Sequence, residues 1–139
     1  MYRFVPHALL LGALLSTAAC GDNASTPTTP TPTTPETITE TFSGSINRNG
    51  AATHTFLAQA SGSVTATLTT LAPESVTAIG VSLGTWNGTA CQLVIANTSA
   101  AQGAVILGVA SSAGNFCVFV QDVGTIADTA SYEITVVHP

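Results

Sequence analysis

The stretch 62–68 reads GSVTATL, and it decides the fold class of the chain. Its apolar residues Val64, Ala66 and Leu68 alternate with serine and threonine, so every second side chain suits a core and the others suit water. A period of two residues is typical of a β-strand that is buried on one face. We therefore expect a half-buried strand here.

Similar apolar runs lie on both sides of this strand, and turn residues separate them. Asn47-Arg48-Asn49-Gly50 predicts a type I′ hairpin, because Asn-Gly supplies the positive φ values that this turn needs. The other strands are expected at 37–46, 52–59, 79–83, 91–96, 104–109, 116–120 and 131–137. About eight short strands without a helical period predict an all-β fold, a single antiparallel β-sandwich or jelly roll over residues 38–139.

Charged residues are scarce: they make up 6% of the chain, against 45% hydrophobic residues. There is no lysine, and after residue 20 Arg48 is the single cation against seven acidic residues. Such a surface cannot release counterions from phosphates, which excludes DNA and RNA as partners. Attraction to anionic lipid head groups is disfavoured for the same reason.

The first residues have the pattern of a signal peptide, with Arg3 followed by a mostly apolar run that is too short to span a bilayer. The stretch 14–20, LLSTAAC, resembles the lipobox of bacterial lipoproteins, which implies a signal peptide at 1–19 and a lipid on Cys20. The alternative is an ordinary secretory signal cut near Ala19. Repeated threonine and proline then predict a disordered, extended spacer over residues 20–37. Such tracts also serve as glycosylation sites or as PxxP ligands.

Three cysteines in an exported protein leave one without a partner. If Cys20 carries a lipid, Cys91 and Cys117 remain as a pair in an oxidising compartment. We expect them to form a disulfide that joins two segments across the core. A metal site on these cysteines is disfavoured, because no Cys-x-x-Cys or His-x-x-x-His spacing is present.

Several short motifs resemble those of bacterial pre-peptidase C-terminal (PPC-type) domains. They are Phe42-Ser43-Gly44, His54-Thr55-Phe56, GSVTATL at 62–68, GNFCVFV at 114–120 and YEITV at 132–136. The resemblance implies a β-sandwich that acts as a non-catalytic appendage or as a free-standing surface module. Some members of that family bind Ca²⁺ or carbohydrate.

Few residues are candidates for chemistry. Ser82 lies in Gly80-Val81-Ser82-Leu83-Gly84, which matches the G-x-S-x-G of α/β-hydrolases, but it sits inside a predicted strand with no helix after it. The histidine that such a triad would need downstream is His138. His54 shares the face of Phe56, so we interpret it as a buried, hydrogen-bonded histidine.

Two further sites are weaker or ambiguous. Asp122 and Asp128, together with Glu133, are candidate Ca²⁺ ligands, although Asp122 also suits a turn-forming role. Trp86 is expected to close one end of the core; the alternative is a stacking surface for a sugar ring.

The sequence as a whole predicts a non-catalytic binding or accessory module of the bacterial cell envelope. We expect its lipid to anchor it in the outer membrane, facing the periplasm or the cell surface. We expect no enzyme activity and no cofactor. The expected partners are the membrane, through the lipid, and a cell-surface glycan or an envelope protein. The alternatives are a carbohydrate-binding accessory domain and, as the weakest, a serine hydrolase that uses Ser82.

The lipid anchor gives the first testable prediction. Cells that express the protein and are fed an alkyne fatty acid should label it, because the Cys20 thiol is the expected acylation site. The Cys20→Ala variant should lose the label, whereas Cys91→Ala should retain it. Labelling of the protein without Cys20 would contradict the assignment.

Overall fold

The computed structural model describes residue 34 and residues 36–139. The predicted signal peptide, Cys20 and most of the threonine- and proline-rich segment lie outside these described residues. Residues Thr33–Pro139 form one compact unit that contains every described strand, the hydrophobic core and the pair of cysteines. No helix in the described part of the chain is long and apolar enough to cross a membrane.

All regular structure in the described range is β. The strands are β1 (Ile38–Asn47), β2 (Ala51–Ala58), β3 (Gly62–Ala72), β4 (Ile79–Trp86), β5 (Cys91–Ala100), β6 (Val105–Ala110), β7 (Gly114–Gln121) and β8 (Thr129–His138). Each coincides with a strand expected from the sequence, although β3, β4 and β5 continue four, three and four residues farther than expected. The predicted all-β class is therefore confirmed.

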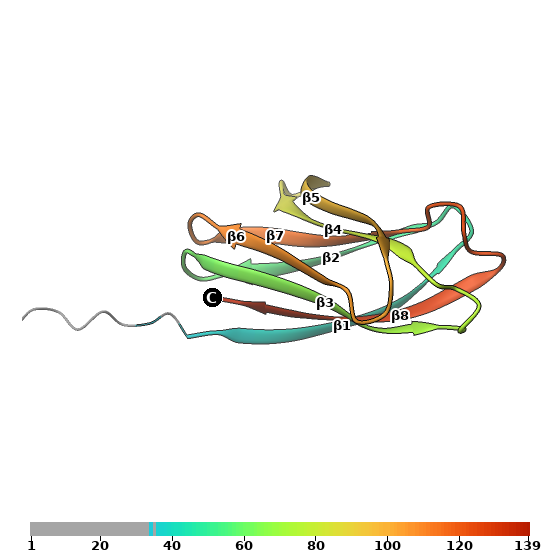
Figure 1. The fold of residues 1–139 in the computed structure, drawn as a ribbon. Helices are drawn as coiled ribbons and strands as arrows, with labels where there is room; N and C mark the ends of the chain where they lie inside the picture. Colours follow the sequence, from blue (N-terminus) through green and yellow to red (C-terminus); the bar gives the residue numbers. More distant parts are fainter. Residues whose placement is uncertain (1–33, 35) are drawn as a thin grey trace, which may run out of the picture. The chain divides into compact units, whose positions relative to one another are not determined.

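The strands form two antiparallel four-stranded sheets with the orders β1-β8-β3-β6 and β2-β7-β4-β5. The sheets lie one above the other as two layers (Figure 1). Among the described strands only β4 and β5 are consecutive neighbours within one sheet, and every other connection passes from one sheet to the other. This order, with two interlocked Greek keys, is that of a jelly roll.

The predicted hairpin at Asn47–Gly50 is wrong. The turn does form, because the N–H of Gly50 donates to the carbonyl of Asn47 at 2.8 Å and Asn49 has a φ of 58°. However, β1 pairs with β8 and β2 pairs with β7, so the turn carries the chain between sheets. A local turn motif specifies that the chain reverses, but the sheet that the next strand joins depends on distant partners.

Alternation along the strands builds the core between the two sheets. Val64, Ala66 and Leu68 of β3 are buried, as the sequence predicts, and β3 lies inside its sheet between β8 and β6. On the facing sheet, Val118 and Val120 of β7 point inward in the same way. These inward faces hold the layers together by removing aliphatic surface from water.

The predicted disulfide between Cys91 and Cys117 is confirmed, with their Cα atoms 5.8 Å apart. Its expected position across the core is wrong, because β5 and β7 belong to the same sheet and flank β4. Cys117 alternates with the inward-facing Val118, so the bond lies on the outer face of the sheet. The bond passes near Gly84 of β4, where a Cβ atom would overlap the carbonyl oxygen of Gln92. The glycine therefore allows β5 to approach closely enough for the bond to form.

The disulfide should make a measurable contribution to stability. Replacing Cys91 and Cys117 by alanine opens a loop with a sequence separation of 26 residues, and should lower the free energy of unfolding by about 3–4 kcal/mol. Urea denaturation of the 33–139 fragment measures this loss. A reducing agent should destabilise the parent fragment by a similar amount and leave the double variant unchanged; equal stability of all samples would refute the prediction.

Candidate functional site

A pocket of about 700 Å³ opens beside Trp86, at one end of the β2-β7-β4-β5 sheet. Its walls come from β1, β2, β4, β7 and the turn after β4. The lining residues are Glu40, Thr55, Phe56, Leu57, Trp86, Asn87, Gly88 and Asn115. The pocket therefore combines the aromatic rings of Trp86 and Phe56 with hydroxyl, amide and carboxylate groups.

Trp86 is the last residue of β4 and is half-buried. It does not belong to the hydrophobic core, so the expectation that it closes one end of the core is wrong. Its cross-strand neighbour is Cys91, which the disulfide ties to β7. Trp86, an aromatic wall of the pocket, therefore lies next to the disulfide that links β5 to β7.

The turn after Trp86 is fixed by its own side chain. The Oδ1 atom of Asn87 accepts hydrogen bonds from the N–H groups of Thr89 at 2.9 Å and Ala90 at 2.8 Å. The Asn87 N–H in turn donates to the carbonyl of Ala90 at 3.3 Å. Asparagine commonly stabilises turns in this way. Because Oδ1 is used inside the turn, the amide nitrogen of Asn87 is the group left to face a ligand.

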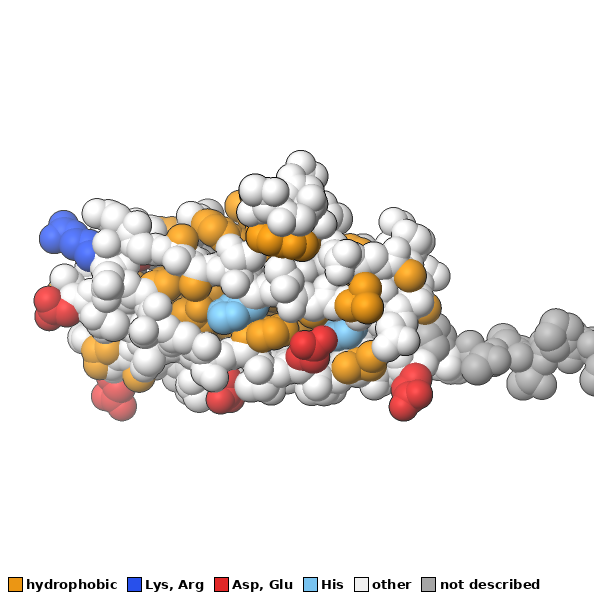
Figure 2. Space-filling model, turned by 180° about the vertical axis from the view of Figure 1, so that it is seen from behind, with side chains coloured by type: hydrophobic (Ala, Val, Ile, Leu, Met, Phe, Trp, Pro, Cys, Tyr) orange, Lys and Arg blue, Asp and Glu red, His pale blue; other side chains and the backbone are white. Residues whose placement is uncertain are grey.

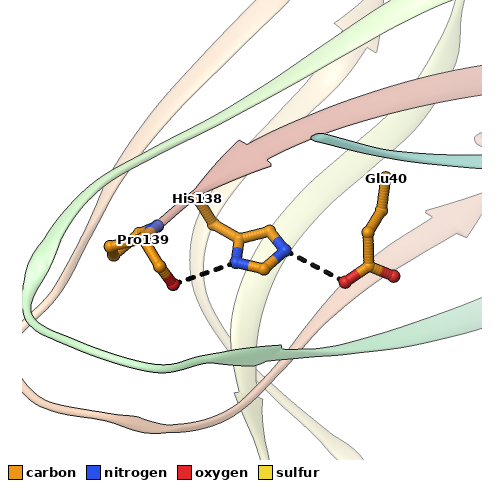
Figure 3. Close-up of polar contacts among 3 residues, drawn as sticks. All are labelled: Glu40, His138 and Pro139. Atoms are coloured by element: carbon orange, nitrogen blue, oxygen red, sulfur yellow. Dashed lines mark hydrogen bonds and ion pairs between the residues drawn. The ribbon is translucent and has the colours of Figure 1, made fainter. Parts of the chain in front are cut away.

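Glu40 is held in place by His138 (Figure 3). Its Oε1 lies 3.0 Å from Nε2 of His138, and the other ring nitrogen, Nδ1, lies 3.2 Å from the Pro139 carbonyl oxygen. The Pro139 oxygen and the Glu40 carboxylate oxygen are both acceptors, so the imidazole ring is the donor group in this arrangement. The His138 ring is fully buried and packs on Phe56 with centroids 4.8 Å apart.

This arrangement suits binding better than acid–base catalysis. Both nitrogens of His138 are engaged and the ring has no contact with solvent, so the imidazole has no atom with which to take a proton from a ligand. Glu40, with 37% of its side chain exposed, is oriented toward the pocket and keeps Oε2 for a hydrogen bond. No sequence pattern indicates this pair, because the two residues are 98 positions apart.

A second histidine links the two sheets farther along the same edge. His54 Nε2 of β2 and the Tyr132 hydroxyl of β8 lie 2.8 Å apart, and the Phe42 ring stacks on the imidazole at 5.1 Å. Burial lowers the pKa of His54 and raises the pKa of Tyr132. Gly44 makes room for the tyrosine, because a Cβ there would lie 2.6 Å from its hydroxyl oxygen. The prediction of a hydrogen-bonded histidine is confirmed.

The face in Figure 2 shows histidine side chains among hydrophobic ones along its middle, with an acidic side chain beside them. The described histidines are His54 and His138, and both contact residues of β1. The edge where β1 and β2 meet is thus closed by aromatic and polar contacts.

Ser82 does not take part in a catalytic triad among the described residues. It is buried in the middle of β4, opposite Phe119 on one side and Ala96 on the other. No strand-to-helix turn holds it, and the hydrogen bonds of His54 and His138 go to other residues. The G-x-S-x-G match is therefore a coincidence of strand composition.

Asp122 is a turn-forming residue. Its Oδ1 accepts the backbone N–H groups of residues 124–126 at 2.9–3.1 Å, and its Oδ2 accepts the N–H of Asn49 at 2.8 Å. The Asn49 bond, followed by those from 124–126, holds the pKa of this carboxyl below its ordinary value, against an opposing effect of desolvation. Donors face both oxygens of Asp122, as expected for its turn-forming role, and a Ca²⁺ role of Asp122 with Asp128 stays a prediction. No group of three metal-ligating side chains occurs in the described range.

Comparison of the sequence with models of protein families finds no match, and the search of curated proteins finds none either. The functional expectations drawn from PPC-type domains therefore stay predictions.

The role of Asp122 predicts an acid-sensitive contribution to stability. Because its folded pKa is depressed, this contribution is present above the unfolded pKa of about 3.9 and is lost as the pH falls through the folded pKa. Asp122→Ala should lower the melting temperature at pH 6 and have a smaller effect near pH 2–3. Asp128→Ala, which removes the same charge from a side chain without these bonds, serves as the control. Equal effects of the two variants at both pH values would contradict the assignment.

Proposed function

We propose that the protein is a non-catalytic carbohydrate-binding module of the bacterial cell envelope, which holds a neutral sugar in the Trp86 pocket. The observation that carries the proposal is the combination of the Trp86 ring with the Glu40 carboxylate and the amides of Asn87 and Asn115 around one pocket. Lipidation at Cys20 would tether the module, and the threonine- and proline-rich segment would hold it away from the membrane.

The chemistry of the lining residues matches that of a sugar. One face of a pyranose ring is apolar and stacks on an aromatic ring, while its hydroxyl groups require donors and acceptors around the rim. Asn87 and Asn115 supply amides, Thr55 supplies a hydroxyl, and Glu40 accepts hydrogen bonds. A pocket of about 700 Å³ is within the usual range for a small ligand.

The charge of the site favours a neutral ligand over an anionic one. Glu40 is the charged residue of the lining, and Arg48, the single arginine of the described range, lies at the β1–β2 turn and does not contribute to the pocket. Phosphate and sulfate groups bind where basic side chains or helix N-termini gather. The charged group that a phosphorylated or sulfated glycan would meet in this pocket is a carboxylate, which repels it.

The pocket is also rigid before a ligand arrives. The Asn87 turn, the disulfide beside Trp86 and the His138 contact to Glu40 each fix one part of the wall. Side chains that are already ordered lose little conformational entropy on binding. This preorganisation of the pocket wall supports a binding function.

Glycan-array binding by the 33–139 fragment tests the proposal. The fragment should bind neutral glycans, and Trp86→Ala should weaken the best of them by about tenfold or more, because the stacking surface is removed. Phe119→Ala deletes an aromatic side chain elsewhere on the same sheet and should keep the parent affinity. Absence of binding to every glycan, or unchanged binding by Trp86→Ala, would refute the proposal.

A further inference from the structure

The β5 and β6 strands form the edges of the two sheets on the side away from the β1–β2 edge. Each has one paired neighbour, β4 for β5 and β3 for β6, so each presents a row of backbone groups that no described strand satisfies. Exposed aliphatic side chains gather on these two strands. This β5–β6 patch consists of Leu93, Val94, Ile95, Val105, Leu107 and Val109.

The patch is apolar and hollowed. Leu107 is 68% exposed and Val109 is 75% exposed, values far above those of core residues. A groove of about 430 Å³ runs between Ile95 of β5 and Leu107 of β6. It adjoins a second cavity of about 360 Å³ that reaches inward to Phe56 and Leu83. Contiguous exposed apolar surface of this kind commonly marks an interaction site.

The segment that carries the patch contains no charged residue. From residue 75 to residue 121 there is no Asp, Glu, Lys, Arg or His, and this range includes all of β4, β5, β6 and β7. Soluble sheet proteins normally protect an edge strand with a charge, a proline or a bulge. β6 has none of these, and its pairing with β3 runs without a register shift.

We propose that a second copy of this chain covers the β5–β6 patch, with β6 of one copy pairing antiparallel to β6 of the other. Two copies that each carry an excess of acidic residues repel one another across most of their surfaces. At the β5–β6 patch two copies can come into contact without burying a charged side chain. A two-fold axis makes such an interface self-complementary, and it joins the two β1-β8-β3-β6 sheets into one continuous sheet.

The side chains of β6 fit a register centred on Leu107. In that register Leu107 lies opposite Leu107 of the second copy, and Val105 lies opposite Val109 of the second copy, all on the outer face. On the inner face Ile106 lies opposite Gly108 of the second copy, so a large residue meets a small one. Directly opposed residues of an antiparallel pair interact strongly, and aliphatic pairs of this kind stabilise a sheet.

A bilayer fits this surface less well than a second copy. Hydrocarbon cannot satisfy the free N–H and C=O groups of the β6 edge, whereas another strand can. The patch also contains no Trp, Tyr, Lys or Arg, the residues that usually sit at the level of lipid head groups.

Sedimentation or light scattering of the 33–139 fragment tests the proposal. The fragment should dimerise reversibly as its concentration rises, and Leu107→Glu should weaken dimerisation at least tenfold, because it places two like charges directly opposite each other. Val123→Glu changes an exposed valine outside the patch and should dimerise like the parent. Circular dichroism and a melting curve confirm that both variants remain folded.

A cross-link tests the register without relying on a disruptive change. Leu107→Cys should form a covalent dimer under mild oxidation, because opposed Cα atoms in the pairing lie within disulfide distance. Val123→Cys should stay monomeric on non-reducing gels. A parent fragment that stays monomeric when concentrated toward the millimolar range overturns the proposal. Dimerisation that Leu107→Glu leaves intact overturns it as well. Binding of a monomer to phosphatidylcholine vesicles would assign the patch to lipid instead.

Discussion

The burial of alternating aliphatic side chains between two sheets is the constraint on which this molecule depends. Most strands contribute one face to the core, whereas β5 contributes Ala100, and neither sheet can cover its own apolar face alone. Polar side chains alternate with these aliphatic ones, as along β3, and face away from the core. At the β1–β2 edge, the bond between His54 and Tyr132 and the packing of His138 on Phe56 join the two layers. The β5–β6 edge has no comparable contacts and remains apolar.

The period of two residues made the fold class and all eight strands predictable, because alternation is a local property of the chain. The sheet that each strand joins is a non-local property. Asn47–Gly50 is a strong turn motif, yet it connects strands of different sheets. The pairing of Cys91 with Cys117 followed from counting cysteines. The place of the bond could not be predicted, since it depends on β4 lying between β5 and β7 and on the close approach at Gly84.

The candidate site was predictable only in part. Trp86 stood out by its residue type, whereas Glu40 and Asn115 reach the pocket from strands far away in sequence. The sequence indicates His138 only as the histidine that a Ser82 triad would need, whereas in the structure its ring contacts Glu40 and orients that carboxylate. Asp122 suits a turn by its residue type, and four backbone donors place it in that role, but which donors reach its carboxyl depends on the fold around it.

The interleaved strand order also governs when the protein can fold. β8 lies between β1 and β3, so the β1-β8-β3-β6 sheet cannot assemble before residues 129–138 have been delivered. Partial chains that end earlier leave β1 without its neighbour and the core open. Pairing between segments so far apart in sequence makes folding slow compared with folds built from local contacts.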